Sequence, residues 1–167
     1  MKILITGGCG YKGSYLIPLL LDSGHEIISV DTQWFGNYLI NHKNLQNLKV
    51  DIRNIDKVPM NGIDVVIHLA NIANDPAVEL NPTLSWEVNV LAGQQLIEKA
   101  QRNNVSHFIF ASSGSVYGVK DEPKVTEDLE LVPISVYNKT KMVAERVFLS
   151  YKEKMKIHCV RPATVCG

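Results

Sequence analysis

Tyr137 and Lys141 stand four positions apart in a segment with helical periodicity. Residues with this spacing share one face of a helix, so both side chains can act on one substrate. A free phenol has a pKa of about 10, too high for a base at neutral pH, and a nearby ammonium lowers that pKa. In a cleft the pair suits general acid–base chemistry, whereas on an open surface it is only a tyrosine beside a solvated lysine.

Two serines, Ser112 and Ser113, follow an apolar run of strand length at 107–110. In open α/β sheets the carboxyl ends of the strands form the ligand-binding edge. From that edge the Ser113 hydroxyl can hold a substrate oxygen next to Tyr137, although a serine at such a place more commonly satisfies the backbone of a turn. The metal-free catalytic set that these residues predict is Ser113, Tyr137 and Lys141.

The glycine-rich segment 6–13, TGGCGYKG, directly follows the first apolar run and precedes a helical pattern. It matches GxGxxG from Gly8 and GxxGxxG from Gly7. Glycines let the backbone approach a pyrophosphate, and the free N–H groups of the following helix bind its charge. The alternative is a tight turn that only packs strand against helix, because such motifs mislead out of context. In this context the segment predicts a dinucleotide-binding turn.

Asp31 ends the second apolar run, 21 positions after Gly10. In dinucleotide folds a carboxylate here accepts hydrogen bonds from the adenosine ribose and repels a 2′-phosphate. Residues 32–34 include no arginine or lysine that would receive such a phosphate, although Lys12 is a nearby cation. The sequence therefore predicts NAD in preference to NADP. Asp51, after the third strand, is placed to accept from the adenine amino group, or it closes a turn.

Apolar runs of strand length alternate with segments of helical period along the whole chain. Several runs are apolar at consecutive positions, as in strands covered by helices on both faces of a parallel sheet. The pattern predicts an α/β fold, a Rossmann-type doubly wound parallel sheet in three layers, α/β/α. The expected strands are 2–5, 26–30, 48–50, 64–69, 107–110 and 156–160.

Capping residues mark the expected helices. A first helix should run from the glycine turn to Ser23-Gly24, where glycine can take the left-handed closing conformation. Asn81-Pro82 marks another start, since a side-chain cap is followed by proline at the first helical position. The later helices are expected over 82–103 and, after a cap at Ser135, over 135–152.

Composition excludes several classes of function. Basic and acidic residues both number 17, so a formal net charge of +0 gives no long-range field for nucleic acid. The three cysteines form no CxxC pair, and the histidines make no metal-ligand pattern, so we expect no metal and a reducing, cytoplasmic setting. His68, within an apolar run, is expected to be a core histidine. We also expect no membrane span or export signal.

Taken together, these segments resemble the extended short-chain dehydrogenase/reductases, especially nucleotide-sugar epimerases and dehydratases. The resemblance covers the whole chain, and several blocks in the right order are more specific than any one of them. The matching blocks are 6–13, Asp31, 51–53, 64–70, Asn89-Val90, 112–118, 137–141 and 161–167.

The resemblance implies a role for each matching residue. Ser113 would be the catalytic hydroxyl and Tyr137 the acid/base, while Tyr137 and Lys141 would also contact the cofactor, Lys141 through the nicotinamide ribose. The other cofactor contacts it implies are Gly7, Gly10, Tyr11, Lys12 and Gly13 at the pyrophosphate, Asp31 at the adenosine ribose, Asp51 and Ile52 at the adenine, Leu69, Ala70 and Asn89 along the wall, and Pro162 near the nicotinamide.

The chain departs from the family pattern in places. Sugar dehydratases carry acidic residues directly after the catalytic hydroxyl, whereas Gly114 and Ser115 stand here, so elimination of water is disfavoured. Such relatives run to roughly twice this length, with a smaller carboxyl-terminal domain over the substrate. Residues 1–167 are therefore expected to be the NAD-binding domain alone, weak or inactive by itself. Other departures are Lys12, Asn71 and Cys166.

The function that the resemblance implies is NAD-dependent epimerisation of a nucleotide sugar, in which hydride leaves a sugar hydroxyl and returns to the other face of the ketone. One alternative is an NAD(P)-dependent sugar dehydrogenase or 4-keto reductase, which would consume its cofactor. Another is a non-catalytic NAD-binding module, against which the intact catalytic set argues. The helices at 82–103 and 135–152 resemble those of a dimer contact in the family, so a homodimer is expected.

Overall fold

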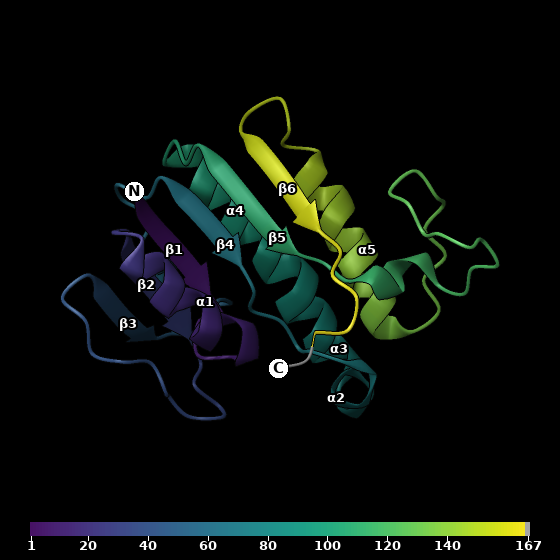
Figure 1. Cartoon of the computed structure of the whole chain (residues 1–167), viewed down its shortest axis with the longest axis horizontal. Helices are drawn as coiled ribbons and strands as arrows, with labels where there is room; N and C mark the ends of the chain where they lie inside the picture. The colour runs from purple at the N-terminus through teal and green to yellow at the C-terminus, as the bar shows by residue number, and fades with distance from the viewer. Residues whose placement is uncertain (166–167) are drawn as a thin grey trace.

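The computed structural model describes residues 1–165, so Cys166 and Gly167 lie outside the described residues. Six parallel strands form one sheet in the order β3-β2-β1-β4-β5-β6 (Figure 1). This confirms the predicted doubly wound parallel sheet. The strands are β1 (Lys2–Thr6), β2 (Glu26–Asp31), β3 (Leu45–Lys49), β4 (Val65–His68), β5 (His107–Ala111) and β6 (Lys156–Val160).

Strand β3 is the one whose predicted position differs most from the structure. It runs from Leu45 to Lys49, whereas the sequence pattern placed it at 48–50. As an edge strand β3 pairs only with β2, and its side chains are half-buried or exposed. Polar residues such as Gln46 and Asn47 are tolerated there, so no apolar run marks its beginning.

The helices that follow the glycine turn and Ser135 begin where the sequence predicted, and the first also ends there, whereas the second ends three residues before the predicted position 152. Helix α1 spans Tyr11–Asp22 and closes with Gly24 at a φ of +81°. Helix α5 spans Val136–Leu149, and the Ser135 hydroxyl accepts a hydrogen bond from Asn138 N at 3.1 Å. Since α5 carries Tyr137 and Lys141, this cap fixes where their turn of helix begins.

The helical run predicted after Asn81 is present but irregular. The Asn81 side chain accepts from Leu84 N at 3.0 Å, and a π-helical turn interrupts the run. Such turns are uncommon and often lie at functional sites. The run consists of α3 (Pro82–Trp86), the π-helical η2 (Glu87–Leu91) and α4 (Ala92–Arg102). Short elements that the periodicity did not predict are α2 (Asp75–Leu80), η1 (Ile55–Lys57) and η3 (Gly114–Tyr117).

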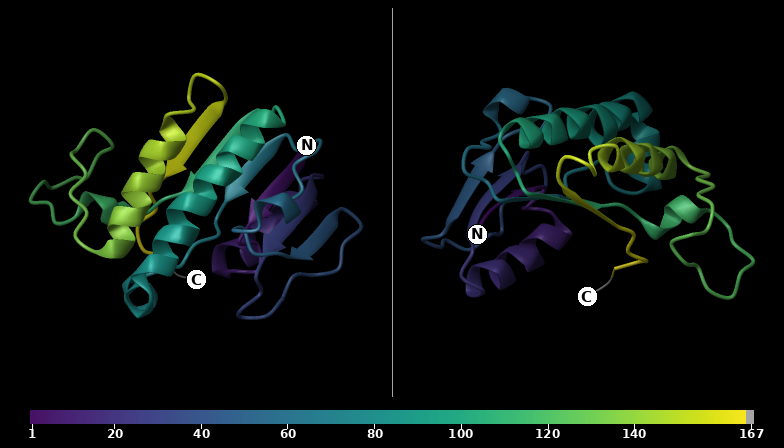
Figure 2. Two further views of the ribbon diagram at one scale, coloured as in Figure 1. Left: turned by 180° about the vertical axis from the view of Figure 1, so that it is seen from behind. Right: turned by 90° about the horizontal axis from the view of Figure 1, so that it is seen from above.

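Helices lie on both faces of the sheet (Figure 2). Helix α1 covers one face at β1 and β2, and α4 and α5 cover the other. Phe108, Phe110 and Phe148 fill the larger core, between the sheet and α4 and α5, while Ile5 and Ile17 belong to the smaller core under α1. None of the helices among residues 1–165 combines the length and apolar character needed to span a bilayer.

Beside α1 the same face of the sheet stays open. Over β5 and β6 the described part of the chain places no helix on this side (Figure 2). Side chains therefore alternate in burial along β5, where Phe108 and Phe110 are buried and Ile109 only partly so, and Val160 of β6 is exposed. The third layer thus covers β1, β2 and the adjoining side chains of β4, but not β5 and β6, in the described part of the chain.

Candidate functional site

A cleft of about 600 Å³ runs along the carboxyl ends of the strands. Its walls come from the glycine turn, the segments after β2 and β3, the loop after β4, the end of β5 and one face of α5. Ligands bind at this edge in doubly wound sheets, where the strand order reverses between β1 and β4. The predicted site residues that line it are Gly7, Gly10, Tyr11, Lys12, Gly13, Asp31, Asp51, Ile52, Leu69, Ala70, Tyr137 and Lys141.

The glycine turn has no room for side chains at two positions. A Cβ on Gly7, whose φ is +74°, would lie 2.6 Å from Ala70 N, and a Cβ on Gly13 would lie 2.4 Å from the Gly8 carbonyl oxygen. The turn after β1 is thus packed directly against the loop after β4 and against the start of α1. The first N–H groups of any helix have no intrahelical acceptor and carry its positive dipole end. The turn therefore fits a pyrophosphate.

Asp31 connects the glycine turn to the segment after β2. One of its carboxylate oxygens accepts from Cys9 N at 3.0 Å, and the other accepts from Gln33 N at 2.7 Å. Each oxygen retains a further lone pair. The carboxylate is thus held in place with acceptor capacity toward the cleft, which fits a ribose with two free hydroxyls.

Asp51 is more fully engaged than Asp31. Its carboxylate accepts from the Arg53 guanidinium, with Nη2 at 2.7 Å, and from Arg53 N at 2.9 Å. The hydrogen bond from Arg53 holds the pKa of Asp51 below its usual value. The carboxylate therefore closes a turn, as one sequence interpretation had it, while also lining the cleft.

The structure brings the three predicted catalytic side chains together. Lys141 and Tyr137 share one face of α5, with the Lys141 Nζ 5.8 Å from the centre of the Tyr137 ring and donating to the Ala111 carbonyl at 2.8 Å. Ser113 directly follows Ser112, which lines the cleft, and its hydroxyl hydrogen-bonds Tyr137. The Ser113 hydroxyl also accepts from Ser115 N at 3.2 Å, so it caps a turn as well.

Burial governs the proton affinities of the pair. Lys141 is 2% exposed, and its burial, aided by the positive charge of Lys12, lowers its pKa to about 7, against the opposing effect of Glu145. Burial raises the pKa of Tyr137, with the hydrogen bond from Ser113 opposing. The sequence predicted a lowered pKa for Tyr137, but in the structure it is raised, because desolvation of the phenolate outweighs the hydrogen bond from Ser113.

Lys141 is expected to make stability depend on pH. Its pKa falls from 10.5 to about 7 on folding, so between these values the unfolded chain binds more protons. Stability through this group therefore falls as pH drops from about 10 to about 7, and the deficit is constant below. We expect the melting temperature of Lys141→Met, relative to that of wild type, to be higher at a pH of about 6.5 than at a pH of about 9.5. The change in this difference should correspond to a few kcal/mol. A difference that is the same at both pH values would contradict the lowered pKa.

Two predicted cofactor contacts, Asn89 at the wall and Pro162 near the nicotinamide, are not among the residues that line the cleft. Asn89 is buried, and its side chain accepts from Ile72 N at 2.7 Å and donates to Ile72 O and Thr140 Oγ1. It therefore holds the loop that lines the cleft. The Pro162 carbonyl accepts from Gly114 N at 2.8 Å, which joins the segment after β6 to the turn that follows Ser113.

A buried ionic network next to the catalytic set was missed by the sequence analysis. Glu145, 1% exposed, accepts from the Ser112 hydroxyl and from the Arg161 guanidinium, with Nη2 at 2.7 Å and Nε at 3.0 Å. Arg161 also donates to the Tyr117 hydroxyl at 2.8 Å. The one sequence signal for this network is the position of Glu145, four residues after Lys141 on the same helix face.

His68 is the core histidine that the sequence predicted. Its Nδ1 lies 2.7 Å from Thr6 Oγ1, and its ring stacks on Phe110 and meets two further phenylalanine rings. Burial lowers its pKa to about 3, so it is neutral at physiological pH. Across residues 1–165 no three histidine, cysteine or acidic side chains group as a metal ion would require.

Comparison with known proteins identifies the family. The model of the NAD dependent epimerase/dehydratase family matches residues 3–167. The chain belongs to this family. The members of this family are NAD-dependent, and the glycine turn and Asp31 of this chain are suited to bind that cofactor.

Comparison with individual relatives supports this family assignment. The uncharacterized UDP-glucose epimerase YtcB of Bacillus subtilis is 34% identical, over 96% of this chain and 54% of the relative. The UDP-N-acetylglucosamine 4-epimerase of Methanobrevibacter ruminantium superposes with a TM-score of 0.89 at 28% identity, and the NAD complex of Thermus thermophilus UDP-glucose 4-epimerase with 0.85 at 28%. Both comparisons cover 96% of this chain and 54% of the other. The chain thus spans about half the length of these relatives.

Proposed function

We propose that this chain is the NAD-binding part of a nucleotide-sugar epimerase. The observation that carries the proposal is one continuous cleft that reaches from Asp31 and the glycine turn to Tyr137 and Lys141. A dinucleotide bound along the turn would extend its nicotinamide end toward α5. The relatives that act on UDP-sugars support a nucleotide sugar as substrate.

Each catalytic side chain has a role in this proposal. NAD, when bound, supplies the hydride acceptor. Tyr137 removes the proton of the sugar hydroxyl through its own phenolic oxygen, while Ser113 holds that hydroxyl in line by hydrogen bonding. Lys141, when protonated, favours the Tyr137 phenolate, and the anionic cofactor and substrate would favour that protonation.

The turn after Ser113 favours epimerisation over elimination of water. Gly114 and Ser115, and no acidic residue, directly follow the catalytic hydroxyl. Gly114 N donates to the Pro162 carbonyl, and the Ser115 hydroxyl donates to Asn138 Oδ1 at 2.6 Å. The alternatives remain distinguishable by experiment. A dehydrogenase or 4-keto reductase would consume or form NADH stoichiometrically, whereas an epimerase recycles it, and a non-catalytic module would do neither.

Calorimetric titration with NAD and with NADP tests the cofactor assignment. We expect wild type to prefer NAD, and Asp31→Ala to bind NAD about 10-fold to 100-fold more weakly, the equivalent of losing hydrogen bonds to a charged group. Asp22→Ala, on the exposed end of α1 outside the cleft, is the matched control and should bind as wild type. Equal or stronger binding of NADP would mean that Lys12 outweighs Asp31, and would favour a reductase.

We further propose a homodimer through the helices at 82–103 and 135–152, in a cytoplasmic protein. Both helical runs lie on the same face of the sheet, and Trp86 and Leu91 of the first remain exposed there. Exposed apolar side chains on such a face can take part in a protein contact. A monomeric mass in sedimentation velocity would contradict the dimer.

A further inference from the structure

A tight turn after β2 presents aromatic side chains at the cleft. Gly36 N donates to the Gln33 carbonyl at 3.0 Å, and both residues have positive φ, +57° at Gln33 and +95° at Gly36. The turn therefore carries Trp34 and Phe35 at its tip. Trp34 is 60% exposed, Phe35 85% and Tyr38 79%, and all three line the cleft.

This turn is unusual in both composition and backbone. Turn tips favour glycine, proline, asparagine, aspartate and serine, and a glutamine at positive φ is uncommon. A large aromatic side chain left in water forgoes the free energy that its burial would give. A ligand that buries the rings would explain why a turn with these unfavourable features borders a binding cleft.

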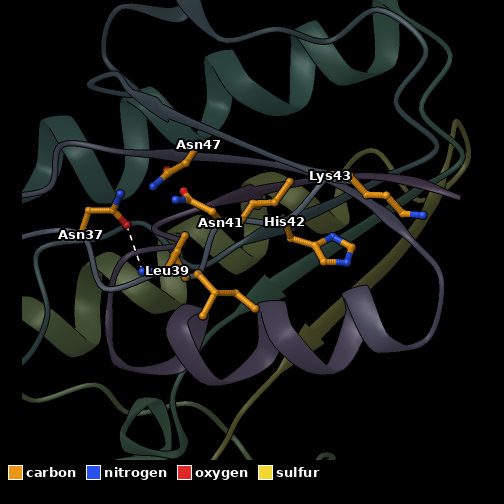
Figure 3. Close-up of a pocket in the computed structure, with 8 residues that line it drawn as sticks. Asn37, Leu39, Asn41, His42, Lys43 and Asn47 are labelled. Carbon is orange, nitrogen blue, oxygen red and sulfur yellow. Dashed lines mark hydrogen bonds between the residues drawn. The ribbon is translucent and has the colours of Figure 1, made fainter.

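Polar contacts help to hold the turn in place. Asp31 accepts from Gln33 N, and the Asn37 side chain accepts from Leu39 N at 3.0 Å and lies 3.7 Å from Cys9 Sγ. A second hollow, of about 500 Å³, borders the segment that continues from the turn (Figure 3). Asparagines and His42 surround that hollow, so it offers little apolar surface to the rings. The dinucleotide cleft, in contrast, has mainly apolar walls.

We propose that Trp34, Phe35 and Tyr38 form an aromatic clamp on the adenine base of the dinucleotide. The proposal rests on the proposed function, in which Asp31 binds the adenosine ribose. The clamp begins three residues after that carboxylate, so a base attached to the ribose lies next to the turn. Adenine presents a flat, neutral π-face, and stacking on aromatic side chains recognises such a face without charge. The clamp sets affinity for the adenine half of the cofactor and leaves the nicotinamide half unaffected.

Tryptophan fluorescence and binding measurements on the full chain test the clamp. We expect NAD and AMP, but not nicotinamide mononucleotide, to quench the tryptophan emission of wild type. The Trp34→Phe variant, which keeps Trp86, should lose this quenching and retain its affinity for NAD. Trp34→Ala should weaken NAD and AMP binding about tenfold and leave nicotinamide mononucleotide unchanged. Tyr15→Ala removes another exposed aromatic side chain (77%), on α1 outside the cleft, and is the control that should bind as wild type.

The possible outcomes separate the clamp from the function on which it rests. If wild type binds NAD and Trp34→Ala binds NAD and AMP within twofold of it, the clamp is overturned and the cofactor site stands. If Trp34→Ala weakens nicotinamide mononucleotide equally, the effect is not specific for adenine and the clamp is also overturned. If wild type binds neither NAD nor AMP, the proposed function fails, and the clamp fails with it. Circular dichroism of each variant verifies that the fold is retained.

Discussion

Replacing Tyr137 with phenylalanine is expected to slow hydride transfer by about 100-fold to 10,000-fold, the range in which a positioned acid–base group contributes. The substitution removes one oxygen and keeps the ring that lies 5.8 Å from the Lys141 ammonium, so the shape of the cleft is preserved. NAD affinity should therefore stay close to that of wild type. The measurement is single-turnover reduction of bound NAD by a nucleotide sugar, with wild type and variant compared at the same chain length.

The pH profile of that reaction gives a second observation. Burial raises the pKa of Tyr137 in the structure without cofactor, so the rate of wild type should increase with pH as the phenol ionises. Ser113→Ala is the companion variant, because it removes the hydrogen bond that opposes this raised pKa, and it should shift the profile toward higher pH. Equal rates of NAD reduction for wild type and Tyr137→Phe would mean that Tyr137 is not the acid–base group.

Replacing Glu145 with alanine is expected to destabilise the fold by about 3–5 kcal/mol, as breaking a buried ion pair does. The substitution strips the partly buried Arg161 guanidinium of its carboxylate and leaves the Ser112 hydroxyl without its acceptor. Both partners belong to segments that hold the catalytic serine turn. Urea unfolding followed by circular dichroism gives the free energy of unfolding.

A second glutamate–arginine pair provides the control for Glu145. Glu98 and Arg102 lie 3.3 Å apart on α4, where the Arg102 side chain is exposed and that of Glu98 only partly buried, so Glu98→Ala should cost less than about 1 kcal/mol. Replacing both Glu145 and Arg161 with leucine should recover part of the loss, because no unpaired charge then remains buried. Equal costs for the two alanine variants would mean that the buried network contributes no more than a surface pair.

The sequence predicted those elements whose own residues carry a signal. Buried strands such as β4 are apolar at consecutive positions, and α5 begins at a residue with a capping side chain. The edge strand β3 carries no such signal, because a strand paired on one side can keep polar residues. Helices as short as α2 complete too few turns to show a period.

The same distinction applies to the site. The glycine turn, Asp31 and the spacing of Tyr137 and Lys141 are local patterns, and the structure places them around one cleft. The pKa of Tyr137 depends on how much water the fold excludes, which spacing does not reveal. The network around Glu145 joins three segments distant in sequence, so only the folded chain shows it.

The central place of β1 in the sheet has a consequence for how the chain is synthesised. Its first neighbour, β2, follows it closely, but the register pairs Ile3 with Val65 on the other side, 62 residues later. A nascent chain that stops before His68 therefore leaves backbone N–H and C=O groups on one edge of the apolar strand β1 unpaired, and other strands can add to that edge. Ribosome-bound intermediates of that length should be bound by chaperones and cut readily by proteases, and both properties should decline once β4 has emerged and docked.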